Sequence, residues 1–364
     1  MEVMRSTPLC LLATTLALLS AQNSMSMGRG RPPALRLTIP EPAGEAAVPL
    51  PPGESMQEVL SPVTVRTKSD ALLWERPWRV IACTLSKRGM RREPPEHTRK
   101  QMQDIHVIRR ILDGRRDILS LVLDGHTSDR AARIARKRIP QALRSQLERM
   151  AQSTTAGIRA ALFDAYLEAD STIGPDDGGT TATGVYIGQD PETGDPTAFF
   201  GTTGDSLSEL YDLDGTRRFA TPLHQPTTPE EAARLRGLSF GSRVAGLAVS
   251  RSLGDHTRRV SSLDGSSTGL IPDPDTASIA LNGARLVLQT SDGVSASTAE
   301  RAALIAQIFQ EAGRRRVQLT RLVGELYQNS CTRGQAPSDD ATITAMLVEP
   351  GEPEPPLSPI PQLH

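Results

Sequence analysis

The stretch Ile118 to Arg130, ILSLVLDGHTSDR, decides the fold prediction, because its apolar run is typical of a buried strand that ends at an Asp-Gly turn. Asp124 therefore stands at the rim of a sheet on a fixed backbone, where a rigid metal ligand needs to be. Gly125 leaves its carbonyl open to a cation, and His126 adds a side-chain type that titrates near neutral pH. An ordinary β-turn accounts for the same residues, so this stretch by itself leaves both interpretations open.

The composition indicates a globular protein without a nucleic-acid partner. The chain has 364 residues, 38% of them hydrophobic, which is enough for one large domain or two modest ones. Its 41 basic and 42 acidic residues nearly cancel and only 3% of residues are aromatic, so neither phosphate-backbone binding nor base stacking is supported. Cys10, Cys83 and Cys331 are far apart and form no C-x-x-C motif, so any metal should have oxygen ligands.

The first 30 residues have the composition of a targeting leader. Arg5 precedes an apolar stretch, Pro8 to Leu19, which is too short to span a bilayer and is similar to a secretory signal. Acidic residues are absent between Glu2 and Glu41, as in an organelle transit peptide. A disordered tail with a chance apolar patch is the third interpretation. The secretory pathway, an organelle and the cytoplasm therefore all stay open.

The rest of the chain divides into a linker, a folded domain and a tail. Residues 31–76 are rich in Pro and Gly and lack apolar periodicity, which predicts an extended linker. The folded domain is expected at 77–348, followed by an acidic, Pro-rich tail at 349–364. Past the leader, apolar runs are too short for a membrane helix, so we expect no membrane span.

Strand and helix patterns are mixed through the domain. Strands are predicted at Val80–Thr84, Gly178–Ile187, Thr197–Thr203, Ala284–Thr290 and 341–348. The helical pattern of Asp129–Met150 is interrupted at Pro140, which favours two helical pieces. An apolar stripe at helical spacing predicts core positions at Ile158, Leu162, Ala165 and Tyr166. Capping signatures at Thr228–Glu231 and Ser297–Glu300 begin two more helices, and Gln318–Gln328 forms another.

Acidic residues stand at one end of three separate strands, at Asp124, Asp292 and Asp339. Carboxylates that meet at a sheet edge repel one another strongly unless divalent cations neutralise them. Ligand sets made only of oxygen favour Mg²⁺ or Mn²⁺ over Zn²⁺. Arg99 in the same cleft would add a fork of donors suited to phosphate.

Eight segments together resemble a known family. They are TRKQMQDIH (98–106), LVLDGH (121–126), GGTTAT (178–183), TGDS (203–206), LHQPTTPEEAARL (223–235), AVSRSLGD (248–255), LQTSDG (288–293) and SDDATIT (338–344). Their order and approximate spacing are similar to those of the metal-dependent protein phosphatases of the PPM family, the protein phosphatase 2C type. The resemblance runs from about Val80 to Val348 and so covers the folded domain.

The resemblance implies an α+β fold, with two antiparallel β-sheets packed as a sandwich and flanked by helices on both sides in four α-β-β-α layers. It also implies a site for two Mg²⁺ or Mn²⁺ ions at one end of the sandwich. Asp124 would bridge both ions, and Asp292 and Asp339 would complete the first site. The Gly125 carbonyl would serve the second ion, near Gln103.

The resemblance further implies that a water between the two ions attacks phosphorus in line. Asp104 would orient this water, and Arg99, three residues before the Met of the family's Arg-x-x-Met-Glu-Asp motif, would bind phosphate. His126 would protonate the departing serine or threonine oxygen. The implied function is hydrolysis of phosphoserine and phosphothreonine in a phosphoprotein substrate, and we expect the chain to act as a monomer.

Some positions depart from the family's pattern. Gln103 stands where the family has Glu, and because a neutral amide is a poorer ligand for a hard cation, the second metal should bind weakly. Thr127 replaces a glycine that usually follows Asp-Gly-His. Ala296 replaces a carboxylate, which argues against a third ion beside Asp205. Gln103 is also the main support for the alternative function, a weak or inactive member of the family that acts as a binding module.

Overall fold

The computed structural model describes residues 78–89, 102–113, 117–150, 153–331, 337 and 339–350. The expected leader (1–30) and linker (31–76) lie outside these residues, as does the predicted phosphate-binding residue Arg99. Of the expected tail, only residues 349 and 350 are described, and they end the last strand.

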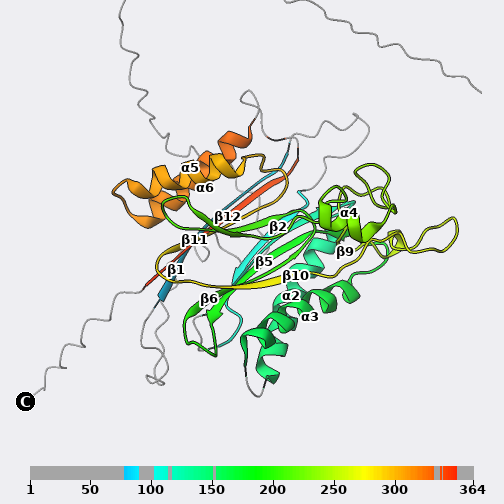
Figure 1. Ribbon diagram of the computed structural model, residues 1–364, viewed down its shortest axis with the longest axis horizontal. Coiled ribbons are helices and arrows are strands. Elements are labelled where there is room, and N and C mark those ends of the chain that lie inside the picture. The colour runs from blue at the N-terminus through cyan, green and yellow to red at the C-terminus, as the bar shows by residue number, and fades with distance from the viewer. Residues whose placement is uncertain are drawn as a thin grey trace, which may run out of the picture. The chain divides into compact units, whose positions relative to one another are not determined.

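The described strands form two antiparallel sheets (Figure 1). The smaller sheet has the spatial order β1 (Trp78–Lys87), β12 (Ala341–Pro350), β11 (Arg285–Thr290), β7 (Leu207–Tyr211) and β8 (Arg217–Ala220). The larger sheet has the order β10 (Asp275–Ala280), β6 (Pro196–Thr203), β5 (Ala182–Gln189), β3 (Ile118–His126), β4 (Gly179–Thr180) and β9 (Leu253–Gly254), and β2 (Asp104–Arg109) also pairs with β3. The predicted strands are confirmed, and β5 and β6 pair with each other antiparallel. The sequence patterns did not indicate β2, β7, β8 or β10.

Helices cover the outer face of each sheet (Figure 1). α2 (Arg130–Arg149) and α3 (Thr155–Thr172) share a buried apolar cluster with β2 and β3 of the larger sheet. α5 (Thr298–Gln310) and α6 (Arg315–Ser330) do the same with β11 and β12 of the smaller sheet. The short elements α4 (Pro229–Leu235) and η1 (His256–Arg258) lie in the connection between β8 and β10. Among the described residues, no helix is both long and apolar enough to cross a membrane.

A third apolar cluster fills the space between the sheets. It includes Val185, Ile187 and Phe200 of the larger sheet and Leu210, Val287 and Met346 of the smaller sheet. Side chains alternate between the two faces of a strand, so each central strand contributes both to this inner layer and to an outer cluster under the helices. The predicted four-layer α-β-β-α sandwich is therefore confirmed.

The predicted break at Pro140 was wrong, because α2 continues through this residue as a single helix. A proline inside a helix costs about 3 kcal/mol, since it lacks an N–H and crowds the preceding turn. The helix offsets this cost by burying one whole face, which consists of Ala131, Ala132, Ala135, Ile139, Pro140, Ala142, Leu143 and Leu147. The predicted stripe at Ile158, Leu162, Ala165 and Tyr166 is buried in α3, as expected.

The two capping signatures have different outcomes. At α5, the Ser297 side chain accepts a hydrogen bond from the Glu300 N–H, and Glu300 in turn accepts one from the Ser297 N–H. At α4, the Thr228 side chain makes no capping bond and instead donates to the carbonyls of Leu223 and Gln225. Both helices begin where the sequence predicted, but the capping box forms only at α5.

The strand register brings the predicted carboxylates to one edge of the sandwich. Thr290 of β11 lies opposite Ile343 of β12, so the residues that follow β11 lie beside those that precede β12. On the larger sheet, Asp104 at the start of β2 lies directly opposite Asp124 near the end of β3. The Ser291 hydroxyl donates to Asp104 Oδ2 over 2.7 Å and ties these two edges together. The sandwich therefore has one acidic end.

The turn between β3 and α2 contains a strained residue. Thr127 has a φ of 72°, in the left-handed region that β-branched residues rarely adopt because the Cβ atom crowds the backbone. Threonine at position 127 thus introduces local strain beside the acidic edge.

Thr127→Gly should raise the free energy of unfolding by about 1 kcal/mol, because glycine adopts this φ without steric cost. Thr127→Ala keeps a Cβ atom and should gain less. Urea denaturation followed by far-UV circular dichroism measures both variants. A Thr127→Gly variant that is less stable than the parent would show that contacts of the threonine side chain outweigh the strain.

Candidate functional site

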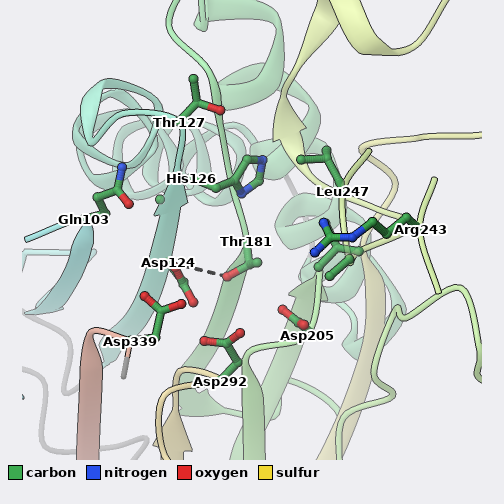
Figure 2. A pocket seen from close by; sticks show the side chains of 13 residues that line it. Gln103, Asp124, His126, Thr127, Thr181, Asp205, Arg243, Leu247, Asp292 and Asp339 are labelled. Carbon is green, nitrogen blue, oxygen red and sulfur yellow. Dashed lines mark hydrogen bonds between the residues drawn. The ribbon is translucent and has the colours of Figure 1, made fainter. Parts of the chain in front are cut away.

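A pocket of about 250 Å³ opens at the acidic end of the sandwich (Figure 2). Its lining includes six residues that the sequence predicted, Gln103, Asp124, Gly125, His126, Asp292 and Asp339. The lining also includes Thr127, Thr181, Asp205, Arg243, Leu247, Ala248 and Val249. In Figure 2 the carboxylates of Asp124, Asp292 and Asp339 lie on one side, with Arg243 and Leu247 on the other. The structure thus brings together residues from three strand ends that are far apart in the sequence.

The backbone around Asp124 is held on both sides. The Asp124 N–H donates to the Thr181 hydroxyl over 3.3 Å, and the Thr181 N–H donates to the Asp124 carbonyl over 2.9 Å. The Gly125 N–H donates to the Gln103 carbonyl over 3.2 Å. A Cβ atom on Gly125 would come within 3.0 Å of that same carbonyl, so only glycine fits here without a shift. These contacts fix the position from which the Asp124 carboxylate enters the pocket.

Burial and mutual repulsion disfavour the charged forms of these acids. The pKa of Asp124 is raised well above its usual value, mainly because the carboxyl is buried and also because Asp104 and Asp292 are nearby. Burial, together with the charge of Asp292, raises the pKa of Asp205 to about 6. Like charges in one buried pocket are a signature of sites that bind a cation or transfer protons.

Asp104 lies behind the pocket rather than in its wall. It is buried, and one carboxyl oxygen accepts the hydrogen bond from Ser291, while Oδ1 has no hydrogen-bond partner among the described residues. Burial is the main cause that raises the pKa of Asp104 to about 7, and the charges of Asp340 and Asp292 add to it. An unpartnered buried oxygen is costly, so this atom points to a missing donor or cation.

The consecutive residues Asp339 and Asp340 have different surroundings. Asp339 lines the pocket, whereas Asp340 accepts backbone hydrogen bonds from Gln103 (2.6 Å) and Gly89 (2.9 Å). Asp340 thereby fastens the start of β2 to the end of β1. The sequence run Ser-Asp-Asp did not reveal which of the two acids faces the pocket, and the family resemblance assigned Asp339.

His126 is paired with an acid that the sequence analysis did not single out. Its Nε2 lies 2.5 Å from Asp255 Oδ2, which also accepts a hydrogen bond from the Ser252 hydroxyl over 2.7 Å. The pair is possible because residue 179 is glycine, since a Cβ atom there would lie 1.9 Å from the Asp255 carboxylate. Although burial alone would raise it, the hydrogen bond from His126 lowers the pKa of Asp255. Asp255 is the last residue of the segment AVSRSLGD (248–255), and this segment was the feature of the sequence that could have indicated Asp255 as a site residue.

A buried polar network supports the opposite wall of the pocket. Although burial alone would raise it, hydrogen bonds from Arg234, Arg251 and Ser250 lower the pKa of Glu231 to about 2. Arg251 also contacts Asp275, which pairs with His224 over 3.0 Å. The other ring nitrogen of this histidine accepts a hydrogen bond from the Gly204 N–H, directly before Asp205. The network therefore fixes the turn that carries the Asp205 carboxylate.

The donor set fits hard divalent cations. Carboxylates, a backbone carbonyl and an amide are oxygen ligands, which Mg²⁺ and Mn²⁺ prefer, and the raised pKa values of Asp104, Asp124 and Asp205 reflect repulsion that a cation would relieve. Within the described residues, however, no three His, Cys, Asp or Glu side chains converge closely enough to form a ready-made metal site. The site residues thus fit the ions in chemistry and line one pocket, but their side chains are not already gathered around a common point.

Comparisons with known proteins agree with this chemistry. The family model "Protein phosphatase 2C" matches residues 95–303, more than half of the chain. The mouse protein "Probable protein phosphatase 1N" is 31% identical over 256 residues, which cover 65% of this chain and 61% of that protein. The bovine "Protein phosphatase 1L" is 29% identical over 194 residues, covering 48% of this chain and 50% of that protein. The chain thus spans only about half to three-fifths of the length of these relatives.

Solved structures show the same fold. The crystal structure of serine-threonine phosphatase 2C from Toxoplasma gondii matches with a TM-score of 0.54 at 18% sequence identity, covering 74% of this chain and 95% of that chain. At this identity the likeness concerns the fold alone. The match of the family model over most of the sandwich shows more, namely that the chain belongs to the protein phosphatase 2C family.

Proposed function

We propose that this chain hydrolyses phosphoserine and phosphothreonine in proteins, with two Mg²⁺ or Mn²⁺ ions as cofactors. The observation that carries the proposal is the gathering of Asp124, Asp292 and Asp339 in one pocket with His126 at its rim. Family membership supports the same reaction. A phosphoprotein substrate follows from the reaction.

The residues around the pocket divide between holding cations and binding substrate. Asp124, Asp292 and Asp339 would hold the ions, with help from the Gly125 carbonyl and, more weakly, from Gln103. When bound, two divalent cations lower the pKa of a water held between them and neutralise phosphoryl oxygens. The unpartnered Oδ1 of Asp104 is the acceptor that would orient the attacking water from behind the pocket. Arg99 stays the predicted phosphate ligand.

His126 would supply the proton to the departing serine or threonine oxygen. The hydrogen bond from Nε2 to Asp255 fixes the orientation of the imidazole ring and leaves Nδ1 as the nitrogen for this transfer. Asp255 is itself held by Ser252. Asp255 is therefore a positioning residue that acts through His126.

A second candidate function rests on Gln103. A neutral amide at a cation site weakens binding of a hard cation, so a chain with this residue would serve as a phosphoprotein-binding module if the second ion is not held. Turnover with added metal separates the two candidates.

Asp124→Ala should lower phosphate release from p-nitrophenyl phosphate with Mn²⁺ by on the order of 10³-fold, because a carboxylate that would hold the ions is lost. The matched control is Asp113→Ala, which removes an exposed carboxylate that pairs with Arg144 away from the pocket. The control should keep the parent rate. Equal rates in the parent and Asp124→Ala would refute the enzymatic proposal, and calorimetric titration with Mn²⁺ would then count the ions that still bind.

Gln103→Glu should lower the Mn²⁺ concentration needed for half-maximal rate by about tenfold, because a carboxylate is a stronger ligand for a hard cation than an amide. Gln103→Ala should leave that concentration unchanged or raise it slightly, since the backbone contacts of residue 103 stay in place. A metal titration of the initial rate measures both variants. If Gln103→Glu left the metal requirement unchanged, the second site would not depend on this side chain.

A further inference from the structure

The backbone that carries Asp255 is strained. Residues 252–259, which we call the 252–259 turn, include β9 and the short helix η1. Within this turn Gly254 has a φ of 81° and Asp255 a φ of 51°, so two consecutive residues lie in the left-handed region. This conformation is unfavourable for a residue with a side chain and persists only where surrounding contacts enforce it. The contacts that hold the turn therefore decide where the Asp255 carboxylate points.

The side chain of Asp170, near the C-terminal end of α3, makes several of these contacts. Asp170 is buried, and its Oδ1 accepts a hydrogen bond from the Gly254 N–H over 2.7 Å. Arg259 donates to both carboxylate oxygens, from Nη1 to Oδ2 over 2.9 Å and from Nη2 to Oδ1 over 2.5 Å. A bidentate pair of this kind fixes the relative orientation of its two groups. Asp170 therefore holds the turn both before and after Asp255.

The backbone of α3 and the Arg259 guanidinium add further ties to the turn. His256 Nε2 lies within hydrogen-bond distance of two carbonyl oxygens at the end of α3, 3.2 Å from that of Asp170 and 3.0 Å from that of Ile173. Arg259 Nη2 also donates to the Ser252 carbonyl over 3.3 Å. The first and last residues of the turn are thus joined through the same guanidinium that pairs with Asp170. We call Asp170 and Arg259 together the clamp.

The turn held by the clamp leads to the imidazole of His126. Asp255, which lies 2.5 Å from His126 Nε2, also accepts a hydrogen bond from the Ser252 hydroxyl, so both residues that fix this carboxylate belong to the turn or contact it. Asp170 is not one of the described residues that line the pocket. Any influence of Asp170 on the pocket therefore passes through Asp255 and His126.

A buried ion pair can also be explained by folding alone. Glu209 and Arg301, which lie 2.8 Å apart in and beside the smaller sheet, form such a pair. Buried ion pairs are often no more stabilising than apolar side chains of the same size, so stability by itself is a weak reason for either pair. The clamp differs from the Glu209 pair in what it holds, because it enforces a strained turn whose carboxylate contacts His126.

We propose that Asp170 positions His126 for proton transfer, with Arg259 and the 252–259 turn as the link. The inference rests on the proposed function and adds to it a positioning residue on α3, outside the pocket. Without the clamp the turn relaxes to ordinary backbone angles, which withdraws the Asp255 carboxylate from the imidazole. The ring then loses the orientation in which it delivers a proton to the departing oxygen.

The test uses two substrates that differ in their need for this proton. p-Nitrophenolate is a stable anion and leaves unprotonated, whereas the oxygen of a phosphothreonine peptide must gain a proton as it departs. The ratio of kcat/KM for the peptide to kcat/KM for p-nitrophenyl phosphate, both measured with Mn²⁺, therefore reports the proton transfer. The ratio does not depend on the folded fraction of a preparation, so a loss of stability alone leaves it unchanged.

Asp170→Asn should lower this ratio by about tenfold, as is typical when a side chain that orients a working group is lost. Asp255→Asn should lower it by on the order of 100-fold, which is the contribution of a general acid. The double variant should have the ratio of Asp255→Asn alone, because Asp170 acts through Asp255. Arg259→Gln opens the clamp from its more exposed side, so it should also lower the ratio, and it takes the place of Asp170→Asn if that variant does not fold.

Glu209→Gln is the matched control, since this carboxylate is also buried and paired with an arginine, away from His126. It should lower the stability of the chain and leave the ratio at the parent value. Two outcomes would overturn the proposal. One is an unchanged ratio in Asp170→Asn, or in Arg259→Gln where it replaces that variant. The other is a double variant whose ratio falls below that of Asp255→Asn by the full factor seen for Asp170→Asn alone.

The experiment separates this inference from the proposed function. If the parent hydrolyses both substrates and the clamp variants keep its ratio, only the inference fails. If the parent hydrolyses neither, the proposed function fails, and the clamp is tested by proton NMR through the downfield Nε2–H signal of an imidazole bonded to a carboxylate, assigned by its loss in His126→Gln. Loss of this signal in Asp170→Asn but not in Glu209→Gln would support positioning of His126. A signal that is missing from the parent, or that persists in Asp170→Asn, would overturn it.

Discussion

The acidic end of the sandwich is governed by the repulsion among buried carboxylates. The raised pKa values of Asp104, Asp124 and Asp205 show that the folded chain disfavours their charged forms. A carboxyl whose pKa is higher in the folded than in the unfolded state costs stability as the pH rises above the unfolded value, and for Asp104 the cost accumulates up to about pH 7. A bound cation would remove this cost, so metal binding and stability of this end are coupled.

A layer of buried, hydrogen-bonded polar side chains lies between the two sheets directly beneath the acidic end. This layer offsets the repulsion by holding the sheets in place. Gln289 of β11 receives a hydrogen bond from Ser120 of β3 and donates to the Thr183 carbonyl and the Ser208 hydroxyl over 3.2 and 3.1 Å. All of these residues are fully buried, and they cross the space between the two sheets. A satisfied buried network favours one relative placement of the layers, which an apolar interface alone would leave less specified. The carboxylates that end the strands are therefore set at fixed positions.

Local sequence patterns predicted those features that depend on a single segment. The strand that ends at Asp124 and the capping box of Ser297 needed only their own neighbours. The continuous helix through Pro140 was missed because its stability comes from a face buried against β3, which no local rule contains. The pairing of Asp255 with His126 joins residues 129 positions apart, and it was missed because it depends on the register of β4 with β9. The family resemblance supplied the site that spacing could not.

At Gln103 the side chain departs from the family's pattern, while the backbone hydrogen bonds that position the site are kept. Its N–H donates to Asp340 and its carbonyl accepts from Gly125, and neither contact involves the side chain. The backbone at this position thus holds the end of β3 whichever residue is present. Replacing a carboxylate by an amide here removes one charge from a crowded acidic pocket, which lowers the repulsion in the absence of metal. The same change weakens the attraction for a second cation. Under the proposed function, the amide at position 103 would therefore lower the affinity for the second cation and raise the stability of the metal-free fold.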